Sequence, residues 1–354
     1  MATMREVARH AGVSIATVSF VVNGTKPVSA ATRARVQASM DELGFRRNVL
    51  ARALASNRTR NLALVFPALE HRLGNTALGV LTSAAVAASA RGFNLVLWPV
   101  SNDPAQLEEY VTGGLVDAVL LMEVTAEDAR IPLLQRLDLP FALIGRTAEP
   151  SGLAYVDMDF AGAVESGLDH LTALGHQHIA LLLGEIASPR LVGYGPIART
   201  RDAFESGMLR RGLAPVIVSA PQTPAGGRAA AADLLRDHPE TTATLVLNED
   251  ALPTFLAGLT AHGRSIPRDM SVLGLATSAD AAAMSDPPVS TLVAPGSELG
   301  RLSVDSMVDR LDDPATPLVQ ALIPCELQLG DTTSPPAGAT RPPRASSQSK
   351  GTVP

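Results

Sequence analysis

Residues 3–24 of the chain read TMREVARHAGVSIATVSFVVNG, and the spacing of residue types in this stretch predicts helices. Thr3 and Glu6 stand three residues apart, which is the spacing of a capping box at the start of a helix. The apolar residues that follow recur three and four positions apart, as one face of a helix requires, at Met4, Val7, Ala8 and Ala11. A first short helix is therefore expected before Gly12.

Two further helices follow after clear turn signals. Gly12 breaks the first pattern, Ser14 can cap a second helix, and Asn23-Gly24 can end it. The inward stripe of this second helix consists of Val18, Val21 and Val22. A third helix is expected after Ser29, and its apolar face consists of Val36, Met40 and Leu43. Three short helices joined by a glycine-bearing turn predict an all-α helix-turn-helix unit.

The charge of this N-terminal part is opposite to that of the rest of the chain. Residues 1–60 contain ten Lys and Arg and three Asp and Glu, a net charge of +7, although the whole chain of 354 residues has a net charge of −6. Residues 334–354 add three cations and no acid, so residues 61–333 carry −16. A basic unit attached to an acidic body indicates that the basic unit binds a polyanion.

The same N-terminal residues resemble the DNA-binding headpiece of the LacI/GalR family of bacterial transcription regulators. The similarity is carried by residues 4–19, 21–24, 28–29, 32–33, 43–45 and 48. Residues 51–54, Ala-Arg-Ala-Leu, are similar to the hinge helix of that family, whereas Arg47 stands where the family usually has proline. The resemblance implies sequence-specific binding to a double-stranded DNA operator.

The second helix is the expected DNA-reading element, because helix-turn-helix docking places its N-terminal part in the major groove. The resemblance assigns base reading to Ile15, Ala16 and Phe20, and apolar side chains favour contacts with thymine methyl groups. Short polar side chains suited to phosphate contacts or to capping are Ser14, Thr17, Ser19 and Asn23. Lys26 can reach either a phosphate or a base edge. Leu54 matches the leucine that family members insert into the minor groove.

The acidic body alternates short apolar runs with segments of helix length, which predicts buried parallel strands with helices between them. The first series of runs comprises residues 62–66, 93–97, 116–121 and 141–144, and the second comprises residues 178–183, 215–219, 242–247 and 271–275. This order predicts an α/β domain of two lobes, in which parallel sheets are flanked by helices and a ligand crevice lies between the lobes.

The family resemblance extends more weakly into the body, in residues 156–163, 170–180, 266–274 and 286–292. It implies a periplasmic-binding-protein-like domain that binds an effector and forms a dimer. The expected domains are a helix-turn-helix headpiece (residues 1–47), a hinge helix and linker (48–60), a two-lobed effector-binding and dimerisation domain (61–333) and a disordered tail (334–354).

The expected effector pocket departs from the family in several places. Residues 71–74 replace an aromatic-bearing N-P-F-F stretch, and Ala276-Thr277 replace an Asp-Asp pair that many relatives use on sugars. An arginine expected upstream of Phe204 can be Arg199 or Arg201, because the spacing leaves both open.

Candidate effector contacts are polar or aromatic residues at predicted strand ends and on the helices that follow. They are His71, Trp98, Arg146, Asp159, Arg201, Asn248 and Glu249. Trp98 can instead be a packing residue, and Asp159 can instead cap a helix. Arg146 and Glu249 can also be solvated charges without a ligand.

Other chemistry finds little support in the sequence. Cys325 is the only cysteine, so one chain has no intramolecular disulfide and no cysteine-rich zinc site. His170, His176 and His178 span a helix end and a strand start, where their side chains should diverge rather than bind a metal. Catalytic motifs and nucleotide fingerprints do not occur, and neither enzymatic activity nor a cofactor is expected.

The sequence as a whole predicts a cytoplasmic, dimeric transcription regulator, because no apolar run is long enough for a membrane span and the first ten residues lead into no apolar segment. Repression is the family default, with a palindromic operator and a small-molecule effector of the carbohydrate type as partners and no membrane partner. A tetramer is open as well. The alternatives are a regulator that no longer responds to a ligand, a small-molecule receptor or enzyme that does not bind DNA, a headpiece that binds protein, and a Leu54 that only packs within a linker helix.

Overall fold

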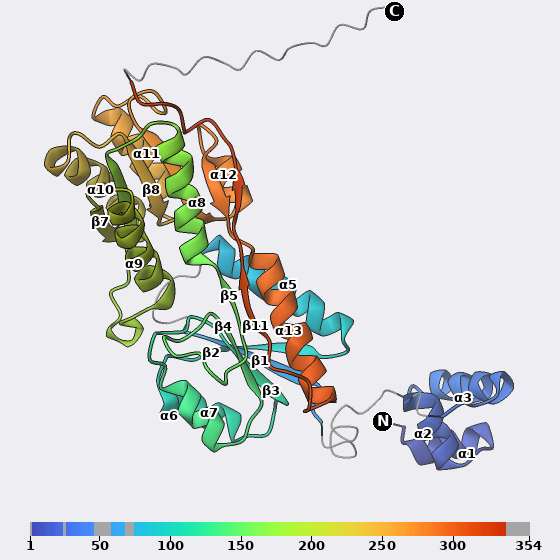
Figure 1. The fold of residues 1–354 in the computed structure, drawn as a ribbon. Helices are drawn as coiled ribbons and strands as arrows, with labels where there is room; N and C mark the ends of the chain where they lie inside the picture. Colours follow the sequence, from blue (N-terminus) through green and yellow to red (C-terminus); the bar gives the residue numbers. More distant parts are fainter. Residues whose placement is uncertain (1, 24–25, 46–57, 68–73, 338–354) are drawn as a thin grey trace, which may run out of the picture. The chain divides into compact units, whose positions relative to one another are not determined.

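The computed structural model of the chain describes residues 2–23, 26–45, 58–67 and 74–337 (Figure 1). The chain divides into two compact units, Met1–Arg60 and Asn61–Pro354, each with hydrophobic core residues of its own. Among the described helices, none is both long and apolar enough to cross a membrane. The expected hinge helix, with Leu54, and the pocket candidate His71 lie outside the described residues.

Three helices form the first unit: α1 (Met4–Ala11), α2 (Ile15–Asn23) and α3 (Ala30–Glu42). The predicted capping box is present, because Thr3 N donates to a Glu6 carboxylate oxygen at 2.7 Å and Glu6 N donates to Thr3 Oγ1 at 3.3 Å. Gly12 ends α1 with a φ of 64°, a left-handed conformation that suits glycine. One valine from each helix is fully buried in the common core, namely Val7, Val18 and Val36. The predicted helix-turn-helix unit is thus confirmed.

The second unit contains two lobes, each built on a six-stranded sheet (Figure 1). The first lobe has the strand order β11-β5-β4-β3-β1-β2 with parallel neighbours throughout. Its strands are β1 (Asn61–Phe66), β2 (Asn94–Pro99), β3 (Ala118–Leu121), β4 (Phe141–Ile144), β5 (Tyr155–Met158) and β11 (Gln320–Ile323). Packed on one face are α5 (Asn75–Ala90) and α13 (Gly296–Asp312), and on the other α6 (Pro104–Val111) and α7 (Arg130–Arg136).

The second lobe has the strand order β12-β10-β9-β8-β6-β7, in which only the β10–β12 pair is antiparallel. Its strands are β6 (Ile179–Glu185), β7 (Val216–Pro221), β8 (Ala243–Leu247), β9 (Ser271–Thr277), β10 (Ser290–Val293) and β12 (Glu326–Gln328). Packed on one face are α8 (Phe160–Ala173) and α9 (Gly195–Arg210), and on the other α10 (Pro224–Asp237), α11 (Leu252–Ala261) and α12 (Ala279–Met284).

The chain passes between the two lobes three times. It crosses from β5 to α8, returns from β10 to α13, and crosses again from β11 to β12. The first lobe therefore combines residues from two distant parts of the sequence, and the crossing segments join the lobes along one side (Figure 1).

The predicted fold class is confirmed, and all eight predicted strands are present within two residues of their expected bounds. Four strands were not predicted, β5, β10, β11 and β12, because each is short and lacks a long apolar run. β5 contains Asp157, and all three residues of β12 are exposed, so neither resembles the buried parallel strands that pattern analysis detects.

The folded body extends slightly beyond its expected end at residue 333. Ser334 N donates to Ser271 Oγ at 3.0 Å, and the Ser334 carbonyl oxygen lies 2.9 Å from His176 Nε2. Ser334 is thus held by polar side chains of the second lobe, which composition alone could not indicate. The remainder of the expected tail, residues 338–354, lies outside the described residues.

Candidate functional site

The N-terminal turn of α2 is exposed on the first unit and is held in place by a cap and by a buried core residue. Ser14 caps the helix, because Thr17 N donates to Ser14 Oγ at 3.0 Å. Ile15 is 46% exposed and Ala16 is also exposed, whereas the next turn is fixed by the fully buried Val18. An exposed first turn on a well-fixed helix is compatible with insertion into the major groove, where apolar side chains can contact thymine methyl groups.

The remaining DNA-contact candidates lie around this turn. Thr17, Ser19 and Phe20 are half-buried, so each presents only part of its side chain to solvent. Asn23 is the last residue of α2, and its side chain is outside the description, as is Leu54. The base and phosphate roles of all these residues stay predictions.

Lys26 and Phe20, named separately from the sequence, are neighbours in the structure. Lys26 Nζ lies 5.1 Å from the centre of the Phe20 ring, which is a cation–π distance. Lys26 is exposed, so its ammonium group remains accessible to a phosphate or a base edge. The two candidates therefore form one composite surface next to α2.

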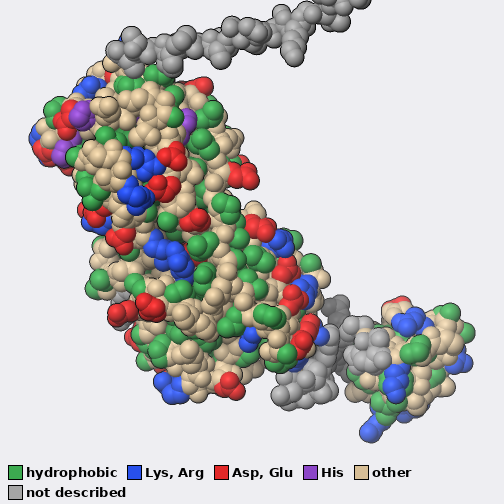
Figure 2. All heavy atoms as spheres, viewed as in Figure 1, with side chains coloured by type: hydrophobic (Ala, Val, Ile, Leu, Met, Phe, Trp, Pro, Cys, Tyr) green, Lys and Arg blue, Asp and Glu red, His purple; other side chains and the backbone are tan. Residues whose placement is uncertain are grey.

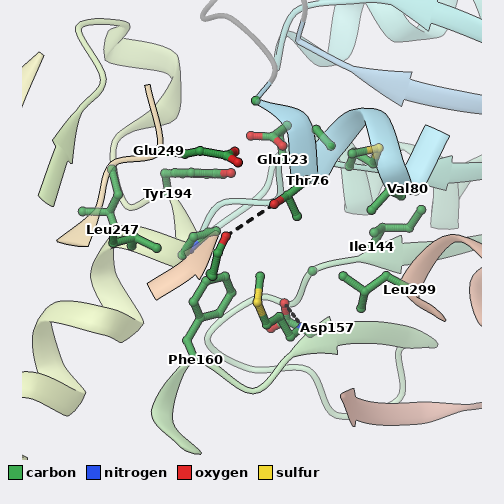
Figure 3. A pocket seen from close by; sticks show the side chains of 18 of the residues that line it. Thr76, Val80, Glu123, Ile144, Asp157, Phe160, Tyr194, Leu247, Glu249 and Leu299 are labelled. Atoms are coloured by element: carbon green, nitrogen blue, oxygen red, sulfur yellow. Dashed lines mark hydrogen bonds between the residues drawn. The ribbon is translucent and has the colours of Figure 1, made fainter. Parts of the chain in front are cut away.

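A cavity of about 200 Å³ lies between the two lobes of the body, at the carboxyl ends of their parallel strands (Figure 3). Apolar side chains from both lobes form much of its wall, among them Val80, Ile144, Leu247, Leu275 and Leu299. Figure 3 shows the carboxylates of Glu123 and Glu249 and the ring of Tyr194 gathered toward one end of the cavity. The crevice predicted from the strand order is thus a real cavity with an apolar and a polar part.

Two residues of the cavity wall have unusual backbone conformations. Glu123 and Ala276 both have a φ of 55°, which costs energy for any residue with a Cβ atom and is found most often at functional sites. Arg130 stabilises the backbone at Glu123, because its Nη2 donates to the Met122 and Glu123 carbonyls at 3.1 and 3.4 Å. Arg130 is fully buried and pairs with Asp128 at 2.7 Å, so this support is rigid.

Asp157, which is the centre of an ion-pair cluster, forms another part of the wall. Asp157 Oδ2 lies 3.2 Å from Arg146 Nε of the same lobe and 3.0 Å from Arg199 Nη2 of the second lobe. Burial raises the pKa of the Asp157 carboxyl, and the charges of Arg199 and Arg146 oppose that rise. Burial also lowers the pKa of the Arg199 guanidinium, which lies 5.6 Å from the centre of the Phe160 ring. This cluster joins the two lobes at the cavity.

Of the two arginines that the sequence left open, Arg199 takes part in the Asp157 cluster and Arg201 does not, although neither of them lines the cavity. Arg199 reaches Asp157 and also donates to the Arg146 carbonyl at 3.0 Å, whereas Arg201 is exposed and does not line the cavity. Naming Arg201 as the pocket arginine was therefore wrong in its placement. The two residues stand about 200° apart around α9, since each residue turns a helix by about 100°.

Trp98 and Asp159 have the structural roles that the sequence left open as alternatives to effector binding, namely packing and helix capping. Trp98 is 5% exposed within the core between β2 and α6, and its ring lies 5.3 Å from that of Tyr110, so it packs there instead of facing the cavity. Asp159 caps α8, because Gly162 N donates to its carboxylate at 2.9 Å. Neither residue lines the cavity.

Asn248 and Glu249 line the cavity and are already held by hydrogen bonds. Asn248 Nδ2 donates to the Ala220 carbonyl at 3.2 Å, and its Oδ1 accepts from Ala251 N at the same distance. Glu249 Oε1 accepts from Ser278 N and Oγ at 3.1 and 2.7 Å, and from Asn75 Nδ2 of the first lobe at 3.4 Å. Glu249 thus contacts the starts of α12 and α5, one in each lobe.

Several wall residues were not predicted from the sequence, chiefly Thr76, Glu123, Asp157, Tyr194 and Asp250. Asp157 could have been found, because a charged residue inside an apolar strand is rare without a partner. Tyr194 could not, since it reaches the cavity through a bridge between its loop and Thr125 of the other lobe. Ala126 N donates to the Gly193 carbonyl at 2.9 Å in the same contact.

The three histidines near the end of α8 have separate environments. His176 is buried and bonds to Thr242, Ser271 and Ser334, whereas His170 lies 3.1 Å from Thr333 Oγ1. The side chain of His178 is exposed. Burial lowers the pKa of both His170 and His176, which therefore favour their neutral forms.

Two family models match the chain. Residues 3–48 match the model described as bacterial regulatory proteins of the lacI family, and residues 168–333 match a periplasmic-binding-protein-like domain. The first range contains the exposed N-terminal turn of α2, and the second contains all six strands of the second lobe.

Known proteins similar to this chain are transcriptional regulators. The HTH-type transcriptional regulator CelR of Thermobifida fusca is 30% identical over 343 residues, which cover 93% of this chain and 98% of CelR. The solved CelR–cellobiose complex has a TM-score of 0.68 at 27% identity and covers 94% of this chain and 100% of its own. A lac repressor dimer bound to operator shares the fold, with a TM-score of 0.80 at 24% identity and coverage of 94% and 99%.

The resemblance detected in the sequence is confirmed by these comparisons over nearly the whole chain. The chain belongs to the lacI family of bacterial regulatory proteins and is a transcriptional regulator.

Proposed function

We propose that the protein binds a palindromic operator as a dimer and represses the adjacent genes until a small molecule enters the cavity between its lobes. The observation that carries this proposal is the exposed first turn of α2, fixed on a buried valine core. A dimer follows physically, because a single reading helix contacts few base pairs and two-fold symmetry matches a palindrome. Since bacterial DNA lies in the cytoplasm, this role also implies a cytoplasmic location.

At the DNA, Ile15 and Ala16 contact base edges, together with the Phe20–Lys26 surface, and the short polar side chains contact phosphates. Lys and Arg dominate the charged side chains of the three-helix unit in view in Figure 2, which supports attraction to the phosphate backbone. Leu54 inserts into the minor groove in this proposal.

Effector control rests on the contacts that cross the cavity. Arg199 of the second lobe pairs with Asp157 of the first, and Glu249 of the second accepts from Asn75 of the first. A ligand that binds one arrangement of the lobes better than another shifts the population between them, which is the requirement for changing DNA affinity. The CelR complex contains cellobiose, which supports a small organic effector for a similar chain.

The test is a pull-down of genomic DNA by the full-length protein at near-physiological salt, followed by sequencing. The expected result is one palindromic motif, and the Ile15→Glu variant should lose it because a carboxylate on the reading face repels phosphates. Ile15 is exposed, so this variant should fold normally. Diffuse recovery of DNA by the unaltered protein, abolished by modest added salt, would contradict the proposal.

A second candidate is a family member that binds DNA without responding to a ligand. It is favoured by Asn248, whose side-chain amide already donates to the Ala220 carbonyl and accepts from Ala251 N within the protein. Two outcomes of a ligand screen would favour this second candidate. In one, no ligand raises the melting temperature of the body. In the other, a ligand raises it but leaves the DNA affinity unchanged. Enzymatic activity stays unexpected for both, because the similar proteins are regulators.

A further inference from the structure

Two neighbouring carboxylates of the cavity wall have no cationic partner among the residues that the structure describes. Glu249 and Asp250 follow directly after β8, and both line the cavity. Within the described part of the chain, no ion pair involves either residue. The donors to Glu249 Oε1 are a serine amide, a serine hydroxyl and an asparagine amide, all of them neutral.

The two arginines of the Asp157 cluster do not balance these two charges. Arg146 and Arg199 both pair with Asp157, and neither of them lines the cavity. Glu249 and Asp250 are each half-buried, so solvent screens them only in part. A pair of carboxylates in a partly dry cavity favours a ligand that brings positive charge and hydrogen-bond donors.

The rest of the wall limits the body of such a ligand. Val80, Ile144 and Leu299 present apolar surface, as Figure 3 shows for these three side chains. The cavity volume of about 200 Å³ lies below the roughly 300–1,000 Å³ of pockets for drug-sized ligands. A ligand of monosaccharide size fits this volume better than a disaccharide.

We infer that the effector carries a protonated amine, held by Glu249 and Asp250, on a compact body that packs against Val80, Ile144 and Leu299. The inference rests on the proposed effector-controlled regulator and names the chemical class of its ligand. Asp250 is assigned here as an additional specificity-determining residue. A neutral sugar is the competing class, because its hydroxyls can also donate to Glu249 and Asp250, but such a ligand leaves the two negative charges uncompensated.

The test is calorimetric titration of the full-length protein at pH 6.5 with matched pairs of probes. One arm compares glucosamine, galactosamine and mannosamine with glucose, galactose and mannose. The other compares cyclohexylmethylamine with cyclohexylmethanol, which have nearly the same shape. At least one amine should bind at least about tenfold more tightly than its neutral partner, as expected for charge-assisted hydrogen bonds. The arm that shows this preference identifies the body as sugar or alicyclic.

The variants Asp250→Asn and Glu249→Gln keep the side-chain shapes and remove one charge each. Each should weaken binding of the preferred amine about tenfold and leave its neutral partner unchanged. Among the described residues, no hydrogen bond or ion pair involves the Asp250 side chain, so this variant tests the charge without breaking a polar contact between the lobes. Glu109→Gln is the matched control, because Glu109 is exposed on α6 and does not line the cavity.

Three results would overturn the inference: tighter binding of neutral sugars than of their amines, an amine preference that survives in both cavity variants, or no amine binding at up to about 10 mM. These outcomes are separate from the failure of the proposed function. If a palindromic motif is recovered from genomic DNA and one of these three results is also obtained, the proposed function stands and only the amine ligand is rejected. If no motif is recovered, the proposed operator binding is rejected, whichever ligand the cavity binds.

Discussion

The headpiece and the cavity build their functional surfaces in opposite ways. In the headpiece the candidate contacts, Leu54 apart, fall within residues 14–26, and the helix that carries them presents them to solvent. The cavity joins segments that are far apart in the chain, such as Thr76 and Ala276, which are 200 residues apart and share a hydrogen bond. A contiguous surface depends on local patterns, whereas an assembled cavity depends on the packing of whole lobes.

The two regions also differ in what they bury. The headpiece core is almost entirely aliphatic, and Ser39 is its one buried polar residue among those described. The body buries the Asp128–Arg130 pair, the Asp157 cluster and His176. Disturbing the apolar packing should therefore unfold the headpiece, whereas changes of charge and pH should alter the stability of the body.

The largest effect is expected from a core mutation that unfolds the headpiece and leaves the body folded. Val18→Asp places an unpaired carboxylate at a fully buried position, which costs more than about 3 kcal/mol and should unfold the headpiece. Specific DNA binding should vanish while the melting temperature of the body stays unchanged. Ala38→Asp introduces the same charge at an exposed position of α3 and should leave both intact. A parallel loss of body stability in Val18→Asp would show that the units do not fold separately.

The next effect tests the ion pair that joins the lobes. Arg199→Ala leaves Asp157 with Arg146 alone and should lower the free energy of unfolding of the body by about 3 kcal/mol. Denaturant titration measures this change. Arg201→Ala, two residues away and exposed, should stay within about 0.5 kcal/mol of the unaltered protein. Equal effects of the two variants would refute the assignment of Arg199.

A pH effect should appear in the stability of the body, which buries His176. Burial lowers the pKa of His176 in the folded state, so the unfolded state takes up the proton first, near its ordinary pKa of about 6.5. The free energy of unfolding should therefore fall as the pH drops below about 6.5 toward the folded-state pKa, and His170 adds in the same direction.

Thermal melts between pH 8 and pH 5 measure this dependence. His176→Gln should reduce the slope, although it also removes the bonds to Thr242 and Ser271 and is less stable at pH 8. His178→Gln alters an exposed side chain and should reproduce the original profile. The same slope in His176→Gln as in the unaltered protein would place the titrating group elsewhere.

The smallest effect concerns the coupling of Phe20 and Lys26. A double-mutant cycle with Phe20→Leu and Lys26→Met, read out as operator affinity, should give a coupling energy of about 0.5–1 kcal/mol. If Lys26 binds a phosphate, Lys26→Met should also reduce the salt dependence by about one charge. A cycle of Phe20→Leu with Arg35→Met, on the exposed side of α3, serves as the control and should give no coupling. Additive effects of Phe20 and Lys26 would mean that they act independently.

Local pattern was sufficient wherever a structure depends on neighbours in the chain. The capping box at Thr3, the valine stripe of α2 and the eight apolar strands were all predictable, because helix and strand periodicity is a property of a few consecutive residues. The same reasoning missed β11 and β12, which are short, contain no buried residue and pair only with strands that are distant in the sequence.

The sequence by itself determined the headpiece, the alternation of strands and helices, and the family to which the chain belongs. Only the tertiary structure decided that Arg199 and not Arg201 reaches Asp157, that Trp98 packs in a core, and that Asp159 caps a helix. The physical reason is that the direction of a side chain is fixed by helix phase and strand face. Whether that direction leads into the cavity is fixed by the packing of two lobes that the chain crosses three times.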